Sequence, residues 1–529
     1  MRSVIIYPVL LLISACSLLA QNISSKEIQW EWAQQFDVAS VLSTKVDATG
    51  NLYTIGWCSN GEPNSTSTFT SNNGRIDSVR RGYRFLSKYN SSGNLQFLAG
   101  LGTRGDISIR TDFEMQFTID INENIYIITN YVFDSGNKKN GIVIFYSRIN
   151  EINTDSVSIP IHSFQAENNL GTSVIAKLNK SGSIEWIRVI QSNLVNARSN
   201  GNNDIVIRNI ATDRFGNISI LGNYAGLPIF YGGTSVNSPQ RSNVLPPSEY
   251  SSVNLLVQYS SNGDLRWAKT IPSGLTPNLI QCDKNGNILL TGSANSSNSL
   301  IQLDSVLPGI VVRRNFFSRI AFWARYNITG QPLSIQKLDG MSITNMVVDS
   351  ANNIFLTGGI VTSVDKDAIF HSSNGAIQTL TGLELNTGLY LAKYNERDQL
   401  LWYSTTRMTN SSSAYPSPTI AINKNGDCYY AQLLFGDSLI FANNTKFATN
   451  KRWFYNLLIA KYGIQGNLLE AQFSSTATVE RVFAEDIGLR VDLTENIYLS
   501  SGRITGIFNK RLTYNIAKIT SVQELLCKR

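Results

Sequence analysis

Hydrophobic and polar residues alternate along much of the chain in short runs that end at small polar residues. In VDATGNLYTIG, residues 46–56, such runs lie on both sides of the bend DATG. Period-two alternation over four to eight residues predicts β-strands, and the polar residues between two such runs predict a tight turn. We therefore expect the chain to consist of many short antiparallel strands.

This first motif recurs seven times, and each copy starts at an acidic or amide residue that we call its anchor. The anchors are Asp47, Asp120, Asp213, Asp283, Asp349, Asn423 and Asp492. They recur about every 74 residues, a spacing typical of repeat architectures. The anchor side chain can accept backbone N–H bonds inside the turn, where glycine supplies a positive φ in four copies. Asn352, Glu123 and Glu495 take the place of that glycine in the other three copies.

A second motif follows each anchor, and the order of the two motifs never changes. Its copies are FLSKYNSSGNLQF from Phe85, VIAKLNKSGSIEW from Val174, LLVQYSSNGDLRW from Leu255, FWARYNITGQPLS from Phe322, YLAKYNERDQLLW from Tyr390, LIAKYGIQGNLLE from Leu458 and NIAKITSVQELLC from Asn515. The alternating residues and the polar bend predict another hairpin. Each unit of roughly seventy residues therefore contains four antiparallel strands.

A basic residue recurs within the second motif, at Lys88, Lys177, Arg325, Lys393, Lys461 and Lys518. These residues invite a functional interpretation as a ring of charge. We favour a structural one, in which the long stems lie along strand edges and the charged ends reach water or the carboxylates of the turns.

Seven four-stranded meanders cannot bury both faces of each sheet alone, but radial stacking of the sheets does so. The expected fold is all-β: a seven-bladed β-propeller of four-stranded antiparallel blades, closed through the N-terminal strand. IQWEWAQQF from Ile28 resembles the last strand of a unit, which predicts Trp30 or Trp32 beside the final blade. SVQELLCKR at the C-terminal end is a second candidate for that strand, and only one of the two fits the four-strand count.

The two motifs, of the form DxxGNxYxTG and FxAKYNxxGxLxW, resemble those of the bacterial seven-bladed β-propeller repeat (SBBP) proteins. The resemblance covers residues 27–529, and it implies a single propeller domain of seven repeats. It also implies an exported protein with an extracellular or surface role. The family offers no catalytic residues that can be carried over to this sequence.

The composition is that of a folded protein, with 42% hydrophobic and 16% charged residues in a chain of 529. Lys and Arg exceed Asp and Glu by 45 to 38, and the surplus is spread along the chain without a basic tract. Nucleic-acid-binding proteins usually concentrate such a surplus on one face or segment. We therefore expect no nucleic-acid partner.

Residues 1–20, MRSVIIYPVLLLISACSLLA, place one Arg before an apolar run that ends in small residues, as an export signal does. Cleavage after Ala20 makes these residues a signal peptide. Cleavage before Cys16, where ISAC resembles a lipobox, makes residues 1–15 a lipoprotein signal and lipidates Cys16. No later stretch has the ~18 apolar residues of a spanning helix. We expect an exported protein, either secreted or anchored by lipid at the outer membrane or cell surface.

Residues suited to catalysis are sparse. His162 and His371 are the only histidines, which argues against a histidine triad or a multi-histidine metal site, and we expect both to be solvated. Cys282 and Cys428 lie in apolar strand patterns and are expected to be core thiols. The anchor loops cluster oxygen atoms but lack the bidentate Glu of a calcium loop, so we interpret them as turns. We expect no catalytic, metal-binding or cofactor-binding residues.

The variable segments between the second and third strands are the best candidates for binding, because loops on a rigid scaffold carry function. Four of them contain a basic doublet: Arg80 and Arg81, Lys138 and Lys139, Arg313 and Arg314, and Lys451 and Arg452. Emerging on one side, these doublets would form a surface for an anionic glycan, a lipid headgroup or an acidic protein. We favour the alternative that they are separate solvated charges protecting blade edges from aggregation.

The sequence favours an exported, non-catalytic scaffold that binds a protein or glycan at the cell surface. A second hypothesis is a glycan-active lyase or hydrolase with a carboxylate-based site in the central channel, which convergent Asp and Glu residues would support. A third is a quinoprotein-like propeller, because AKYNxxGxLxW faintly resembles the docking motif of pyrroloquinoline-quinone enzymes.

Overall fold

The computed structural model describes residues 30–34, 39–58, 66–80, 83–105, 107–109, 115–133, 140–149, 152–162, 172–193, 205–231, 239–240, 248–295, 299–303, 308–312, 319–361, 367–381, 388–409, 418–434, 438–442, 446–448, 456–473, 487–501 and 516–519. The regular secondary structure of these residues consists of β-strands. None of these residues forms a helix long and apolar enough to cross a membrane.

Each anchor begins a turn between two antiparallel strands, as the first motif predicts. A third and a fourth strand follow, so that in the described part of the chain each of the seven anchors heads one four-stranded antiparallel meander. We number these meanders as units one to seven in chain order.

The strands of the units share one order. The first strands are β2 (Ala39–Val46), β9 (Gln116–Ile119), β15 (Ile205–Thr212), β20 (Leu275–Cys282), β26 (Asn345–Val348), β32 (Thr419–Ile422) and β38 (Ile487–Val491). The second strands are β3 (Leu52–Cys58), β10 (Ile125–Phe133), β16 (Ile218–Tyr231), β21 (Ile288–Ala294), β27 (Ile354–Ile360), β33 (Cys428–Leu434) and β39 (Ile497–Ser501). The third strands are β6 (Arg84–Tyr89), β13 (Thr172–Leu178), β18 (Ser248–Tyr259), β24 (Ile320–Tyr326), β30 (Gly388–Tyr394), β36 (Asn456–Tyr462) and β40 (Ile516–Ile519). The fourth strands are β7 (Leu95–Gly105), β14 (Ile184–Asn193), β19 (Leu265–Thr270), β25 (Pro332–Asp339), β31 (Leu400–Thr409), β37 (Leu468–Phe473) and, for unit seven, β1 (Trp30–Gln34).

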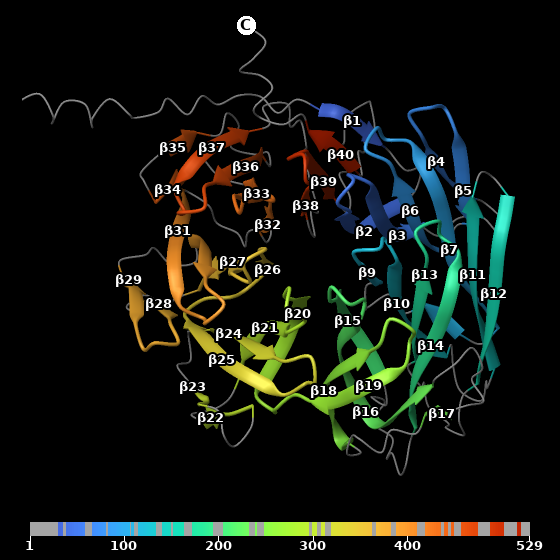
Figure 1. Cartoon of the computed structure of the whole chain (residues 1–529), viewed down its shortest axis with the longest axis horizontal. Coiled ribbons are helices and arrows are strands. Elements are labelled where there is room, and N and C mark those ends of the chain that lie inside the picture. The colour runs from blue at the N-terminus through green and yellow to red at the C-terminus, as the bar shows by residue number, and fades with distance from the viewer. Residues whose placement is uncertain are drawn as a thin grey trace, which may run out of the picture.

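The first strands of the units lie around a common axis, and the sheets radiate outward from it (Figure 1). Each first strand contacts the first strand of the next unit, and β38 of unit seven also contacts β2 of unit one. Sheets arranged radially in this way form a β-propeller, here with four-stranded antiparallel blades. The predicted fold class is confirmed to that extent.

The N-terminal strand β1 forms the outer edge of unit seven. It pairs antiparallel with β40, and Trp32 lies opposite Lys518. The ring of Trp32 packs edge-on against Tyr498 of the same unit, with the ring centroids 6.4 Å apart. The predicted place of Trp32 beside the final blade is therefore confirmed, whereas the competing segment SVQELLCKR lies outside the described residues.

The number of separate sheets differs from the expectation of seven. The described strands form six sheets of four or more strands, because units two and three share one ten-stranded sheet. The long strand β16 joins them, since its first half pairs with β15 and β18 and its last five residues pair with β14. Gly226, with a φ of 82°, lies at the register shift between the two halves. A conformation of this kind favours glycine.

Hairpins between the second and third strands extend the outer edge of the preceding unit. β11 (Asn140–Ile149) and β12 (Ile152–His162) continue from β7, β28 (Ala368–His371) and β29 (Ile377–Leu380) from β25, and β34 (Ser438–Phe441) and β35 (Lys446–Ala448) from β31. Each hairpin covers a strand edge that would otherwise expose unpaired backbone groups. Three of the expected four-stranded blades thus become six-stranded sheets.

The remaining short strands are not part of this pattern. β4 (Thr66–Thr70) and β5 (Ile76–Arg80) form a separate hairpin, as do β22 (Ser299–Ile301) and β23 (Ile310–Val312). β8 (Ile107–Ile109) pairs with β10, and β17 (Pro239–Gln240) pairs with β16.

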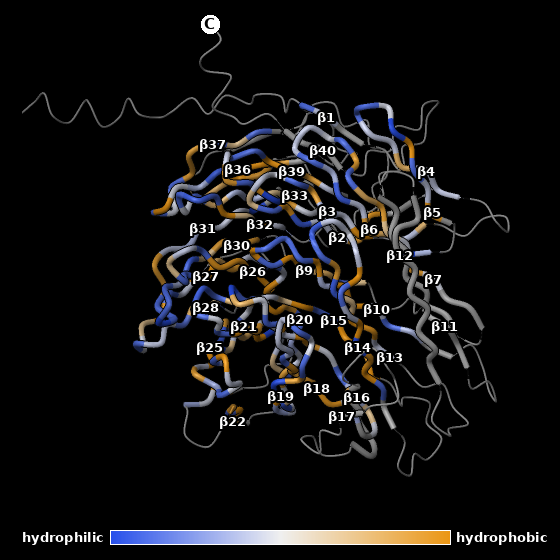
Figure 2. The backbone as a smooth tube through the Cα atoms, turned by 45° about the vertical axis from the view of Figure 1, so that its right-hand side comes forward, coloured by the Kyte–Doolittle hydropathy of each residue, from blue (hydrophilic) through white to orange (hydrophobic). Residues whose placement is uncertain are grey.

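The hydrophobic cores lie between neighbouring units. One buried cluster combines Tyr126 and Ile128 of unit two with Ile218 and Val257 of unit three. Figure 2 shows hydrophobic stretches along paired strands such as β13 and β14, with hydrophilic stretches among them. Because each sheet buries its faces against other sheets, the stability of a unit depends on its neighbours.

Candidate functional site

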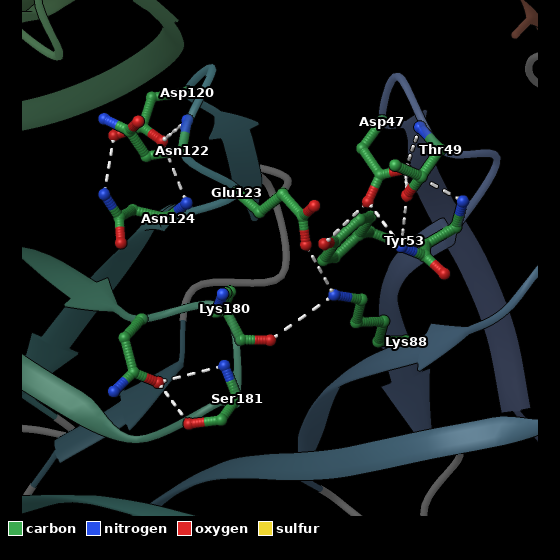
Figure 3. A network of polar contacts seen from close by, with 12 residues as sticks. Asp47, Thr49, Tyr53, Lys88, Asp120, Asn122, Glu123, Asn124, Lys180 and Ser181 are labelled. Carbon is green, nitrogen blue, oxygen red and sulfur yellow. Dashed lines mark hydrogen bonds and ion pairs between the residues drawn. The ribbon is translucent and has the colours of Figure 1, made fainter.

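The anchor of each turn is held by hydrogen bonds within five to seven residues. In unit one, Asp47 Oδ1 accepts bonds from the backbone N–H groups of Thr49 and Asn51, both at 2.9 Å. Its Oδ2 atom accepts bonds from the Asn51 amide at 2.8 Å and from the Tyr53 hydroxyl at 3.1 Å (Figure 3). The carboxylate is thus occupied by donors of its own turn, which confirms its interpretation as a turn residue.

Asp492 repeats this arrangement in unit seven, with Thr494, Asn496 and Tyr498 as donors. Burial opposes the charged form of Asp492, but side-chain and backbone hydrogen bonds from Asn496 and Thr494 outweigh it, so the pKa of this carboxyl is lowered. A carboxyl group with a lowered pKa in the folded state stabilises the fold above its unfolded pKa, and this contribution is lost as the pH falls.

We therefore expect the urea midpoint of the protein to decrease between about pH 5 and pH 3, and to decrease less in Asp492→Asn. The substitution is sterically mild, because unit six naturally carries Asn423 as its anchor, whose Oδ1 accepts the Asn425 and Asp427 N–H bonds. Urea titrations across this pH range measure the effect. Identical pH profiles for the two proteins would contradict the assignment.

The basic residues of the second motif pair with turn carboxylates. Lys88 Nζ lies 3.1 Å from Glu123, and Lys461 Nζ lies 3.1 Å from Asp427 and 3.3 Å from Glu495. The Lys393 ammonium lies 3.5 Å from Asp349. The ammonium groups also lie over aromatic rings, as Lys88 Nζ does over Tyr53, 4.9 Å from the ring centroid. The structural interpretation of this ring of charge is confirmed for these lysines.

Each of the non-glycine residues found at positive φ in the described chain contacts the preceding unit. These residues are Glu123, Asn352, Asp398 and Glu495. Glu123 and Glu495 pair with lysines of units one and six, and Asn352 accepts the backbone N–H of Lys284 at 2.9 Å. Asp398 accepts bonds from Arg325 and Trp323 of unit four. The strain of a left-handed conformation is thus accompanied by a bond between units.

Tryptophans near the outer edges join one unit to the next. Trp186, Trp267 and Trp402 each donate their Nε1–H to a carbonyl in the second turn of the following unit, at 2.9 to 3.1 Å. Trp32 of unit seven makes the same bond to Ser91 of unit one, at 3.0 Å. A Cβ added to Gly93, in the Ser91 turn, would lie 3.0 Å from the Trp32 ring, so the ring and the glycine fit closely.

A cavity of about 550 Å³ opens between the two turns of unit two. Its lining consists of Ile121, Asn122, Glu123, Asn124, Asn179, Lys180 and Ser181. Lys88 of unit one holds both turns, because its ammonium donates to Glu123 Oε2 at 3.1 Å and to the Lys180 carbonyl at 3.4 Å (Figure 3). A side chain of unit one therefore joins the two turns that line the cavity of unit two.

Several polar groups of this cavity are available to a ligand. Asn179 Oδ1 accepts bonds from Ser181 and Ser183, but no residue of the described chain pairs with its amide nitrogen. The Asn122 side chain has no described partner either, since only its backbone N–H bonds Asp120. Ile121 beside them is 73% exposed. The Asn122 amide can both donate and accept, and the Asn179 amide nitrogen can donate, so together with an exposed apolar side chain they suit a polyhydroxylated ligand.

The enzyme hypothesis calls for carboxylates that converge in the central channel, which the first strands surround. The seven first strands carry Lys45, Arg208 and Arg490 but no Asp or Glu. These strands therefore supply no carboxylate pair for glycan cleavage. A metal site is not found within the described residues either, since they contain no group of three or more His, Cys, Asp or Glu that could hold an ion.

Most of the predicted basic surface falls outside the described residues. Arg80 ends β5, where its backbone pairs with Thr66, and its side chain is not described. Arg81, Lys138, Lys139, Arg313, Arg314, Lys451 and Arg452 lie outside the described residues, as do Cys16 and the whole segment 1–20. The hypothesis of an anionic partner at these doublets stays a prediction.

The histidines and cysteines take structural positions where they are described. His371 Nε2 lies 2.8 Å from Asp339 Oδ2, so it links the β28–β29 hairpin to β25 and is half-buried, not simply solvated as expected. His162 ends β12, and its side chain is not described. Cys282 and Cys428 are free thiols packed against core clusters, as predicted, and burial raises the pKa of both.

Three hairpins between second and third strands, β4–β5, β28–β29 and β34–β35, follow a third motif that the two-motif pattern missed. STFTSNNGRIDS from Ser67 and AIFHSSNGAIQT from Ala368 align with SLIFANNTKFAT from Ser438. Ser71 and Ser372 occupy the same place, and each accepts the backbone N–H of the first residue of a fourth strand, Leu95 or Leu400. The sequence pattern that could have predicted these hairpins lies in the segments that were interpreted as variable loops.

Comparisons with known proteins show distant similarity only. No protein-family model and no curated protein matches the chain, so the resemblance to SBBP repeats stays a prediction. Among solved structures, the Dos1 propeller is 8% identical with a TM-score of 0.36 over 94% of each chain. A protein of unknown function from Bacteroides caccae is 11% identical with a TM-score of 0.24, over 58% of this chain and 93% of that chain. A variant of Synechocystis apocarotenoid oxygenase is 10% identical with a TM-score of 0.28, over 84% and 93%. TM-scores this low carry no argument about function.

Proposed function

We propose that the protein is an exported, non-catalytic β-propeller scaffold that binds a glycan at the cell surface. In this proposal the seven units form one ring that closes through β1. The pairing of β1 with β40 and the Trp32 bond to Ser91 support closure, because the same tryptophan bond joins units two and three. The apolar segment 1–20 supports export, with Cys16 as the candidate for lipid attachment.

The cavity of unit two is the observation that carries the binding proposal. It combines the Asn122 amide and the Asn179 amide nitrogen with the Lys180 and Glu123 side chains and the exposed Ile121. A sugar presents hydroxyl groups that both donate and accept, together with an apolar ring face, and each of these features has a counterpart in the lining. The turns are short and held by Lys88, so little ordering is required on binding.

Glycan array binding of the mature protein tests this proposal. We expect Asn122→Ala to weaken binding about tenfold, which corresponds to the loss of one or two hydrogen bonds. Asn285→Ala is the matched control, because Asn285 occupies the same position in the turn of unit four and bonds its anchor through the backbone N–H alone. This control is expected to bind as the native protein does.

Two results would contradict the proposal. One is the absence of any glycan ligand for the native protein. The other is equal binding by Asn122→Ala and the native protein, which would place the binding site elsewhere on the scaffold.

A further inference from the structure

The strands around the axis carry charge of one sign only. Among the seven first strands, Lys45, Arg208 and Arg490 are the charged residues, and no Asp or Glu accompanies them. Lys45 lies on β2 and Arg490 on β38, two strands in direct contact (Figure 1). Arg208 lies on β15 of unit three and is exposed.

Lys45 and Arg490 occupy the same position in two adjacent units, two residues before the anchors Asp47 and Asp492. The other five units have uncharged residues there, namely Thr118, Ala211, Gln281, Val347 and Ala421. The repeat itself does not require a cation at this position. Its presence in units one and seven alone places two positive charges next to each other at the junction of the first and last units.

Neither cation pairs with a carboxylate of the described residues. Arg490 donates to the carbonyl of its own neighbour Leu489 at 2.6 Å, and Lys45 has no hydrogen-bond or ion-pair partner among the described residues. The carboxylates of Asp47 and Asp492 are engaged by donors in their own turns. Burial, followed by the charge of Arg490, lowers the pKa of Lys45 to about 7.

Several other cations of the molecule, unlike Lys45 and Arg490, pair with a carboxylate. Lys88, Arg325 and Lys461 each lie within 3.1 Å of a carboxylate oxygen. A half-buried charge without a partner destabilises the folded state, and two neighbouring charges of the same sign destabilise it further. An arrangement of this kind is stabilised when an anion occupies the space between the charges.

We propose that the axial junction of β2 and β38 is a binding site for an oxyanion group, a carboxylate, sulfate or phosphate, held by the Lys45 ammonium and the Arg490 guanidinium. The group can be a free ion or the acidic substituent of a glycan. This site is separate from the cavity of unit two, and the proposal does not depend on glycan binding by that cavity.

Calorimetric titration of the full mature protein tests the site at about pH 6, where Lys45 is protonated. The probes are inorganic sulfate, inorganic phosphate, glucuronic acid and a sulfated disaccharide, with lactose as the neutral control. We expect sulfate or phosphate to bind, and Lys45→Met and Arg490→Met each to weaken binding at least tenfold. Tighter binding of the acidic sugars than of the inorganic ions would identify a glycan substituent as the ligand.

Two control variants make the result specific. Arg208→Met removes the third axial cation without touching the junction, and Asn122→Ala alters the cavity of unit two, so both are expected to bind anions as the native protein does. Each junction variant removes one of two like charges, so without anion its melting temperature is expected to stay the same or rise. No anion binding by the native protein, or unchanged binding by Lys45→Met, would overturn the proposal.

Discussion

Replacing Trp32 with alanine is expected to destabilise the protein by about 3–5 kcal/mol, the range for removal of a large buried aromatic side chain. Trp32 is 8% exposed, packs against Tyr498, and donates its Nε1–H to the Ser91 carbonyl of unit one. The substitution leaves a cavity and an unpaired carbonyl at the junction of the first and last units. Urea denaturation followed by tryptophan fluorescence and circular dichroism measures the loss.

Trp186→Ala is the matched control for this prediction. Trp186 is also 8% exposed and donates its Nε1–H to the Ser261 carbonyl of the next unit at 3.1 Å. If the ring closes through β1, the two substitutions cost similar free energies of unfolding. A loss below about 1 kcal/mol for Trp32→Ala beside a loss of several kcal/mol for Trp186→Ala would show that the N-terminal strand does not support the ring.

The second large effect is expected at Asp398, where the repeat favours glycine and the structure requires a carboxylate. Asp398 has a φ of 59° and a side chain that is 3% exposed. It accepts bonds from Arg325 Nε at 2.8 Å, Trp323 Nε1 at 3.1 Å and Ser334 Oγ at 2.6 Å. We expect Asp398→Gly to destabilise the protein by about 2–4 kcal/mol, because the buried Arg325 loses its nearest carboxylate and keeps only Asp283, at 3.8 Å, and this loss outweighs the relief of backbone strain.

Glu123→Gly provides the comparison, since it also introduces the glycine of the repeat at a positive φ. The Glu123 side chain is 28% exposed, so its bridge to Lys88 is worth less than a buried one. Relief of strain and loss of the bridge are expected to leave stability within about 1 kcal/mol of the native value. Thermal and urea denaturation of both variants check the contrast. A stabilised Asp398→Gly protein would refute the importance of the Asp398 network.

The sequence identified the local elements well because their bonds join residues that lie close in the chain. The Asp47 turn depends on donors two, four and six residues away, and the same spacing recurs at Asp492. The alternation on each side of the turn determines which side chains enter the core. The turns and the four-stranded units could therefore be predicted.

Contacts between units were harder to predict from the sequence. They join residues far apart in the chain, through side chains that differ from unit to unit. The motif shows a lysine at position 88, but only the packed units bring it to both turns that line the cavity of unit two. The hairpins assigned to loops become strands because the edge of the preceding sheet is within reach of their backbone. Strand β16 merges two expected sheets for the same reason.

The sequence by itself determined the repeat, the geometry of its turns and the β-propeller class, since each follows from short-range hydrogen bonding and alternation. Only the tertiary structure decided which strand edges are covered, where a cavity opens and which charges meet. Lys45 and Arg490 are 445 residues apart, and only the contact of β2 with β38 makes them neighbours. Electrostatic interaction depends on distance in space, so no pattern along the chain could reveal it.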